Sequence, residues 1–320
     1  MKRRTSSPEY QFPHQDQEQI NPVVRESGVL CRQINDALRA GDPSAARQHL
    51  SLLENLLGTL GESDPLAAIK TTEGVLEQLS DVDRDKKHQA PESAALASQI
   101  ESLVEGLRAR HTERMMQAAG PGYAQAWQLV KKWNPELSTI PAKFGDAGVA
   151  SYSAGKPGKP EGVNLPHPEN NTTTYEALRK QHPESIERIA EMLDIESSEL
   201  TEETFQQFVL LHELGHAQDR RKHYPEGADG ADTFRTEGRS QLNTLPHGPY
   251  APSKLSNWLQ SAPWETLQEA YPAFRGKTIE RVLQEQAIAY RDLPKERYAD
   301  TFAIQTIEKA RQDPMLGWDP

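Results

Sequence analysis

Residues 208–217 of this chain read Phe-Val-Leu-Leu-His-Glu-Leu-Gly-His-Ala, and this stretch has the most informative spacing in the sequence. His212 and His216 are four residues apart, so on a helix they lie one turn apart on the same face. Two imidazoles placed in this way can share one metal ion, and Glu213 beside the first can act as a general base. The alternative interpretation is a helix that carries two packed or exposed histidines.

A second helical pattern downstream offers a third ligand. Residues 293–303 read Leu-Pro-Lys-Glu-Arg-Tyr-Ala-Asp-Thr-Phe-Ala, in which Glu296 and Asp300 share one helical face. Together the two segments resemble the zincin metalloproteases, and among them the gluzincin-like branch. The resemblance implies that Glu296 binds zinc together with the two histidines, and that Asp300 accepts a hydrogen bond from His212. The alternative is an exposed carboxylate face near a helix start, where acidic residues are favoured.

Other residues near the histidines fit less well. The metzincin branch adds a glycine and a third histidine at fixed offsets, but this sequence has neither there, and the position of the third histidine holds Lys222. Asp219 is a rival ligand on the same helix, and we expect it instead to pair with an arginine or to cap the helix end.

The resemblance implies a hydrolase, specifically a zinc-dependent endopeptidase with one Zn²⁺ per chain and a protein substrate. Glu213 would take a proton from the metal-activated water and later give it to the leaving amine. Two alternatives stay open: a zinc hydrolase that acts on something other than a peptide, and a binding protein that acts through a helical bundle with a silent metal site. The presence of Glu213 favours an enzyme, because a structural metal site needs no general base.

Two further sets of residues are predicted around the metal. Residues 148–155 and 161–166 are rich in β-formers and glycine, and we expect them to form a hairpin. In zincins an edge strand pairs with extended substrate, so the resemblance assigns substrate binding to Gly148, Val149, Ala150, Ser151 and Tyr152. Candidate hydrogen-bond donors to the oxyanion are Tyr152, His247, Tyr250 and Tyr290.

The N-terminal part of the chain predicts helices. Residues 1–20 are polar and rich in glutamine, which is typical of a disordered arm. Three dipeptides then place an N-cap residue before a proline, each followed by an apolar stripe at helical spacing: Asn21-Pro22, Asp42-Pro43 and Asp64-Pro65. A longer helix is expected from about Pro91. Residues 21–118 are therefore predicted to form a helical bundle that positions a substrate or partner, and residues 119–320 the metalloprotease domain.

The fold class expected for the whole chain is mainly α (α+β), with a small β-hairpin or sheet in the second domain. Further along, helices are expected at 174–193, 201–223, 264–290 and 294–312. Between them, residues 226–263 are rich in Gly, Pro, Ser and Asn, and they are predicted to form a long ordered loop.

Composition limits the partners, the disulfide bonds and the location that we expect for this protein. The 320 residues carry a net charge of −11, which argues against a nucleic-acid-binding surface. The lone cysteine, Cys31, excludes a disulfide framework and is expected to be a packed side chain. The first residues are not a secretory signal, and no apolar run predicts a membrane span, so we expect a cytoplasmic protein without a membrane partner. Export by a dedicated apparatus is compatible with the polar N-terminus, and the oligomeric state stays open.

Overall fold

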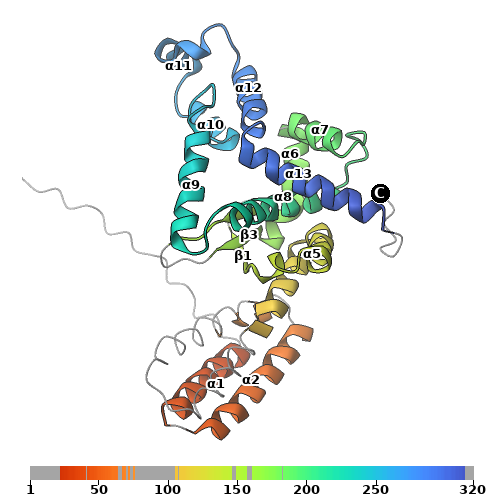
Figure 1. Ribbon diagram of the computed structural model, residues 1–320, viewed down its shortest axis with the longest axis vertical. Helices are drawn as coiled ribbons and strands as arrows, with labels where there is room; N and C mark the ends of the chain where they lie inside the picture. Colours follow the sequence, from red (N-terminus) through yellow and green to blue (C-terminus); the bar gives the residue numbers. More distant parts are fainter. Residues whose placement is uncertain are drawn as a thin grey trace, which may run out of the picture. The chain divides into compact units, whose positions relative to one another are not determined.

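The structure is a computed structural model, and it describes residues 22–40, 42–63, 67–69, 71–72, 75, 105–106, 108–145, 149–156, 161–181 and 183–313 (Figure 1). These residues are mainly helical and include one three-stranded sheet. The chain divides into two compact units, Met1–Leu107 and Arg108–Pro320, whereas the sequence predicted a boundary after residue 118. The predicted arm of residues 1–20 lies outside the described residues, as do residues 91–104 of the predicted longer helix.

The described part of the first unit contains two paired helices, α1 (Pro22–Arg39) and α2 (Pro43–Ser63). Each begins at the proline that the sequence analysis placed at a helix start. Asp42 caps α2, because its Oδ1 accepts hydrogen bonds from the backbone N–H groups of Ser44 (3.1 Å) and Ala45 (3.0 Å). Residues 67–69, 71–72 and 75 are also helical.

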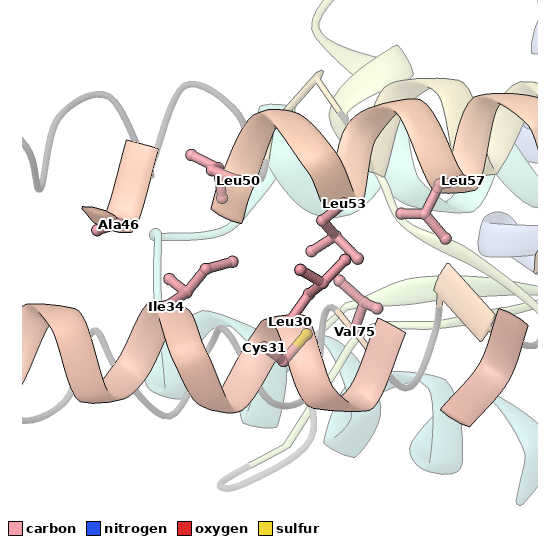
Figure 2. Close-up of a cluster of buried hydrophobic side chains, with 8 residues drawn as sticks. All are labelled: Leu30, Cys31, Ile34, Ala46, Leu50, Leu53, Leu57 and Val75. Atoms are coloured by element: carbon pink, nitrogen blue, oxygen red, sulfur yellow. The ribbon is translucent and has the colours of Figure 1, made fainter. Parts of the chain in front are cut away.

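A small apolar core holds these helices together. Figure 2 shows its side chains meeting between α1 and α2: Leu30, Cys31, Ile34, Ala46, Leu50, Leu53, Leu57 and Val75. Cys31 is fully buried, and burial raises the pKa of its thiol to about 11. Its thiolate is therefore scarce at neutral pH, and the prediction of a packed side chain is confirmed.

The second unit begins with a helix at residues 108–119, followed by α5 (Pro121–Trp133) and a 3₁₀ turn, η2 (Leu137–Thr139). Glu113 links the first two helices: its carboxylate accepts a hydrogen bond from Gln128 Nε2 (2.8 Å) and lies 3.3 Å from Lys131 Nζ. Because its contacts are with α5, the helix at residues 108–119 belongs with the second unit.

The sheet contains β1 (Ala142–Gly145), β2 (Ser151–Ser153) and β3 (Gly162–Pro166) in the order β1-β3-β2. β2 and β3 pair antiparallel, with Tyr152 opposite Val163, so the predicted hairpin forms. β1 pairs with β3 in parallel and was not predicted from the sequence. The central strand β3 is the most buried of the three, and β2 is an edge strand.

Two helices, α6 (Pro168–Gln181) and α7 (Pro183–Met192), replace the single helix predicted at 174–193. Pro183 begins the second of them, because a proline fits the first turn of a helix but not its interior. The next helix, α8 (Glu202–His223), matches its prediction, and Thr201 Oγ1 caps it by accepting from the Thr204 N–H at 3.1 Å.

The predicted loop at 226–263 is wrong. Most of this segment is helical, in α9 (Ala228–Leu242) and α10 (Pro252–Leu259). Gly230 is typical of a turn in the sequence, but it lies within α9 and allows a close packing contact. A Cβ there would lie 1.8 Å from the carbonyl oxygen of Pro225. Ala231 and Phe234 follow it at helical spacing and are buried.

The single helix predicted at 264–290 is also wrong. The chain forms α11 (Trp264–Ala270), a 3₁₀ turn η3 (Pro272–Phe274) and α12 (Ile279–Arg291). Pro272 ends the first helix, and Gly276 adopts φ 74°, which a glycine tolerates best. A local apolar cluster joins α10, α11 and α12: Leu255, Leu259, Leu267, Phe274 and Val282.

The last helix, α13 (Pro294–Arg311), agrees with the prediction and packs against α8 near the middle of the second unit (Figure 1). Among the described residues, no helix combines the length and the hydrophobicity that crossing a bilayer requires.

Candidate metal centre

The site depends on the close approach of α8 and α13. Contacts run in opposite directions along the two helices, from His212 with Asp300 to Asp219 with Lys295, so the helices are antiparallel. Gly215 lies where they meet: a Cβ there would lie 2.7 Å from Ala299 Cα. A glycine at this position therefore lets the backbones touch and brings the histidines of α8 against the carboxylates of α13.

Three side chains converge at this contact. His212 Nε2 lies 3.3 Å from Glu296 Oε2, and His216 Nε2 lies 3.6 Å from Glu296 Oε1. One ligand atom from each of the three residues falls within 4.8 Å of the others. His212 and Glu296 are buried and His216 is partly buried. Two imidazoles and one carboxylate are a donor set that suits zinc, and three protein ligands leave a coordination position for water or substrate.

Asp300 and Arg291 surround the ligands. His212 Nδ1 lies 2.8 Å from Asp300 Oδ1, so this carboxylate fixes the ring orientation and leaves Nε2 facing Glu296. Arg291 Nη1 lies 3.1 Å from the same Asp300 oxygen and 3.8 Å from Glu296 Oε2. The guanidinium thus offsets part of the negative charge of two buried carboxylates.

Burial and pairing set the protonation of the cluster. Burial alone would lower the pKa of His212, but hydrogen bonds to Asp300 and Glu296 outweigh it and raise that pKa to about 9. Burial lowers the pKa of His216 to about 4, so its imidazole is neutral. Burial alone would raise the pKa of Glu296, but the hydrogen bond from His212 and the neighbouring cations hold it at about 2. Glu296 is therefore ionised, as a metal ligand must be.

Glu213 lies next in the chain to His212 and has a pKa that suits a general base. Burial raises the pKa of its carboxyl to about 7, although the backbone N–H of Tyr152 works in the opposite direction. That N–H donates to Glu213 Oε2 at 2.6 Å and so joins the edge strand β2 to α8. A carboxyl group with a pKa near 7 can both accept and return a proton at neutral pH.

Of the four predicted oxyanion donors, Tyr290 is the one beside the ligands. Its hydroxyl hydrogen-bonds the Glu296 carboxylate, and burial together with that carboxylate raises its pKa, so it keeps its proton. The Tyr152 hydroxyl instead donates to Glu161 Oε1 at 2.6 Å, and Glu161 pairs with Arg221 at 3.0 Å.

The other two predicted donors have partners in another part of the unit. His247 Nε2 lies 2.9 Å from Glu285 Oε2 on α12, and the Tyr250 ring stacks on Trp258 of α10 with centroids 6.2 Å apart. The structure therefore does not bring His247 or Tyr250 to the candidate metal ligands, because their contacts are with residues of α10 and α12.

The predicted substrate strand is only partly a strand. Ser151 and Tyr152 belong to β2, whereas Val149 and Ala150 precede it and Gly148 lies outside the described residues. The structure places β2 beside α8, with the Tyr152 amide directed at Glu213 rather than into the ladder with β3.

Asp219 is not part of the ligand cluster. It pairs with His223 Nδ1 at 2.8 Å and faces Lys295 Nζ at 3.8 Å, so the expected arginine partner is wrong. Lys295 is buried, lies over the ring of Phe234 at 3.8 Å and donates to the Tyr224 hydroxyl at 2.5 Å.

Sequence reasoning missed Lys295 and Arg291 as neighbours of the site. The only feature of the sequence that indicated Lys295 and Arg291 was their proximity in the chain to Glu296. This indication is weak, because charged residues near helix ends are common and seldom point inward.

Comparisons with known protein families, with curated proteins and with solved structures found no match to this chain. The functional conclusion therefore depends on the geometry and chemistry of the site.

Proposed function

We propose that this protein is a zinc-dependent endopeptidase whose second unit is a zincin-like catalytic domain. The observation that carries the proposal is the convergence of His212, His216 and Glu296 within 4.8 Å of one another. Glu213, whose pKa is raised to about 7, lies next in the chain to His212. A purely structural metal site would have no use for a buried carboxyl group with this pKa.

The proposed ligands are His212 and His216 through Nε2 and Glu296 through its carboxylate. A zinc ion bound there supplies Lewis acidity that activates a water and polarises a peptide carbonyl. Glu213 takes the proton of the attacking water and then delivers it to the leaving amine, a role that suits its pKa. Its Oε2 is held by the Tyr152 N–H, which orients the carboxylate before substrate arrives.

The surrounding residues have separate roles. Asp300 fixes the His212 ring, and Arg291 holds Asp300 in turn. Tyr290 keeps its hydroxyl proton and is the proposed donor to the oxyanion. The edge strand β2, beside Glu213, is the proposed site for an extended peptide, which would pair with its backbone as an added strand.

The decisive experiment measures metal content and proteolysis together on the full chain. Plasma mass spectrometry should find about one zinc per chain in the wild type and in Glu213→Gln, and little in His216→Ala. Glu213→Gln should lower peptide-bond cleavage by about 10²–10⁴-fold while it keeps the metal. Wild-type protein that binds no zinc after reconstitution would overturn the proposal.

Substrate class needs a separate readout. Wild type and Glu213→Gln are incubated with a cell extract, and new protein N-termini are identified by mass spectrometry. A peptidase should create N-termini that appear only with the wild type. Zinc-loaded protein that creates none would move the assignment to a hydrolase that acts on another substrate class.

A further inference from the structure

A recess lies on the opposite side of the α8–α13 pair from the proposed metal ligands. At 100° per residue, a side chain two positions along a helix projects about 160° away from the first, and this spacing separates Tyr298 from Glu296 on α13 and Gln218 from His216 on α8. These two residues face the same recess, which has a volume of about 720 Å³, and the Tyr298 hydroxyl donates to Gln218 Oε1 at 3.2 Å. The recess therefore shares helices with the metal centre but not its ligands.

Three cations line this recess, in a chain whose net charge is −11. They are Lys222 of α8 and Arg297 and Lys309 of α13, and all three are exposed. Within the described part of the chain none of them pairs with a carboxylate; the Lys309 ammonium lies over the Trp133 ring at 4.6 Å. The one acid in the lining, Asp292, has its own partner, because Arg188 Nη2 lies 3.6 Å from it. The recess thus concentrates positive charge that the protein itself does not neutralise.

The shape of the recess favours an extended ligand. Its lining runs along α13 from Pro294 to Lys309, which at 1.5 Å per residue is about 22 Å. An extended peptide of about seven residues covers that length, whereas a compact anion would contact one end only. Arg297 and Lys309 are separated by about 18 Å on the same scale, so the charge lies towards both ends. Asn134 and Gln305 add amide groups that can bond a peptide backbone.

We propose that this recess binds an acidic, extended peptide segment of a partner protein, with carboxylates near both ends. Arg297 and Lys222 receive the acidic group at one end, and Lys309 receives the one beside Trp133. The aromatic ring at that end also offers a surface to an apolar side chain between the charges. Binding here goes beyond the proposed peptidase activity and does not depend on it, because no metal ligand lines the recess.

The test is fluorescence anisotropy with a labelled peptide of about ten residues that has paired glutamates at both ends. All proteins are full-length and carry Glu213→Gln, so that the probe is not cleaved. Charge reversal by Lys222→Glu with Lys309→Glu should weaken binding by about tenfold or more, and Arg297→Glu should also weaken it. The matched control reverses two exposed lysines elsewhere in the same unit, Lys143→Glu with Lys254→Glu, and should leave the affinity nearly unchanged.

Three outcomes would overturn the proposal. One is the absence of binding at low salt, where exposed charges act most strongly. The second is equal loss of binding in the recess variants and in the control, which would indicate a general charge effect. The third is displacement by ATP at lower concentrations than by unlabelled peptide, which would assign the recess to a compact anion. Zinc content measured on the same samples distinguishes these results from a failure of the metal site.

Discussion

The surroundings of each side chain in the site set its protonation state. His212 and His216 are the same residue type on the same helix, yet the pKa of one is raised to about 9 and that of the other is lowered to about 4. Asp300 and Glu296 favour the charged form of His212, whereas burial dominates at His216. The carboxylates of α13 thus decide the protonation of His212, whereas burial decides that of His216.

Asp300→Asn tests the hydrogen bond behind His212. The amide removes a negative charge from the partner of Nδ1, so the ring loses orientation and basicity. We expect zinc affinity to fall by about 10–100-fold, as measured by competition with a chromophoric chelator. Asp232→Asn, at an exposed position on α9, is the control and should leave zinc affinity unchanged. Equal affinities for Asp300→Asn and wild type would contradict the assigned role.

Glu285 provides a pH-dependent prediction away from the metal ligands. Hydrogen bonds from Lys277 and His247 lower the pKa of its carboxyl to about 2. A carboxyl group whose pKa is lower in the folded state than in the unfolded state stabilises the folded state. This stabilisation is complete at pH values above the pKa of the unfolded state, about 4.3, and is lost as the pH falls towards 2. The difference in melting temperature between wild type and Glu285→Gln should therefore be largest above about pH 5 and shrink in acid. A difference that stays constant from pH 6 to about 3 would contradict this account.

At the scale of elements, the contact between α8 and α13 decides whether the site exists. His212 and His216 are placed by one helix and Glu296 by the other, so a small shift between the helices changes both of the distances from a histidine to Glu296. Gly215 permits the close approach, and Lys295 ties the first turn of α13 to the end of α8 through Asp219. Cation–π contact between Lys295 and Phe234 adds α9 to this arrangement.

Gly215→Ala should separate the two helices. The new Cβ would lie 2.7 Å from Ala299 Cα and 2.9 Å from the Ala299 carbonyl oxygen, and backbone atoms cannot move aside as a flexible side chain does. We expect a loss of about 1–3 kcal/mol in the free energy of unfolding, measured in denaturant, together with reduced zinc affinity.

The matched control is Gly238→Ala within α9. Its Cβ would meet only the Lys295 side chain, at 3.7 Å, which is an ordinary contact. Because alanine favours the helix over glycine, stability should be unchanged or higher by up to about 1 kcal/mol. Similar destabilisation by both substitutions would show that helix interiors in this unit tolerate no added methyl group, and would contradict the role given to Gly215.

At the scale of the whole molecule, the chain has two compact units, and the core of the first is distinct from the candidate metal centre of the second. Leu53 is fully buried in the first unit, whereas its neighbour Leu52 is 50% exposed. The two positions allow one substitution to be compared inside and outside the same core.

Leu53→Ala should destabilise the first unit by about 2–5 kcal/mol, because it leaves a cavity between α1 and α2. Leu52→Ala should cost less than about 0.5 kcal/mol. Hydrogen exchange followed by mass spectrometry should show faster exchange in α1 and α2 for Leu53→Ala, with α8 and α13 unchanged. Faster exchange in α8 would mean that the two units unfold together.

The sequence by itself determined the features that depend on local geometry. Spacing of four residues placed His212 with His216, and Glu296 with Asp300, on helical faces, and both helices formed with nearly the predicted bounds. The N-cap residues Asp42 and Thr201 begin their helices for the same reason, since a cap bonds to the chain two or three residues away.

Tertiary structure decided the features that depend on residues far apart in the chain. Gly230 is typical of a loop in the sequence, but in the structure it lies within α9, where it allows the close contact with Pro225. Strand β1 forms by pairing with β3, which its own sequence does not indicate. Tyr290 lies beside Glu296, whereas His247 and Tyr250 lie elsewhere. The sequence could not distinguish among the four candidate oxyanion donors, because each is a side chain that can donate a hydrogen bond. Arg291 joins the site because α12 ends beside α13. Such placements follow from packing between elements, which the pattern of a single segment does not contain.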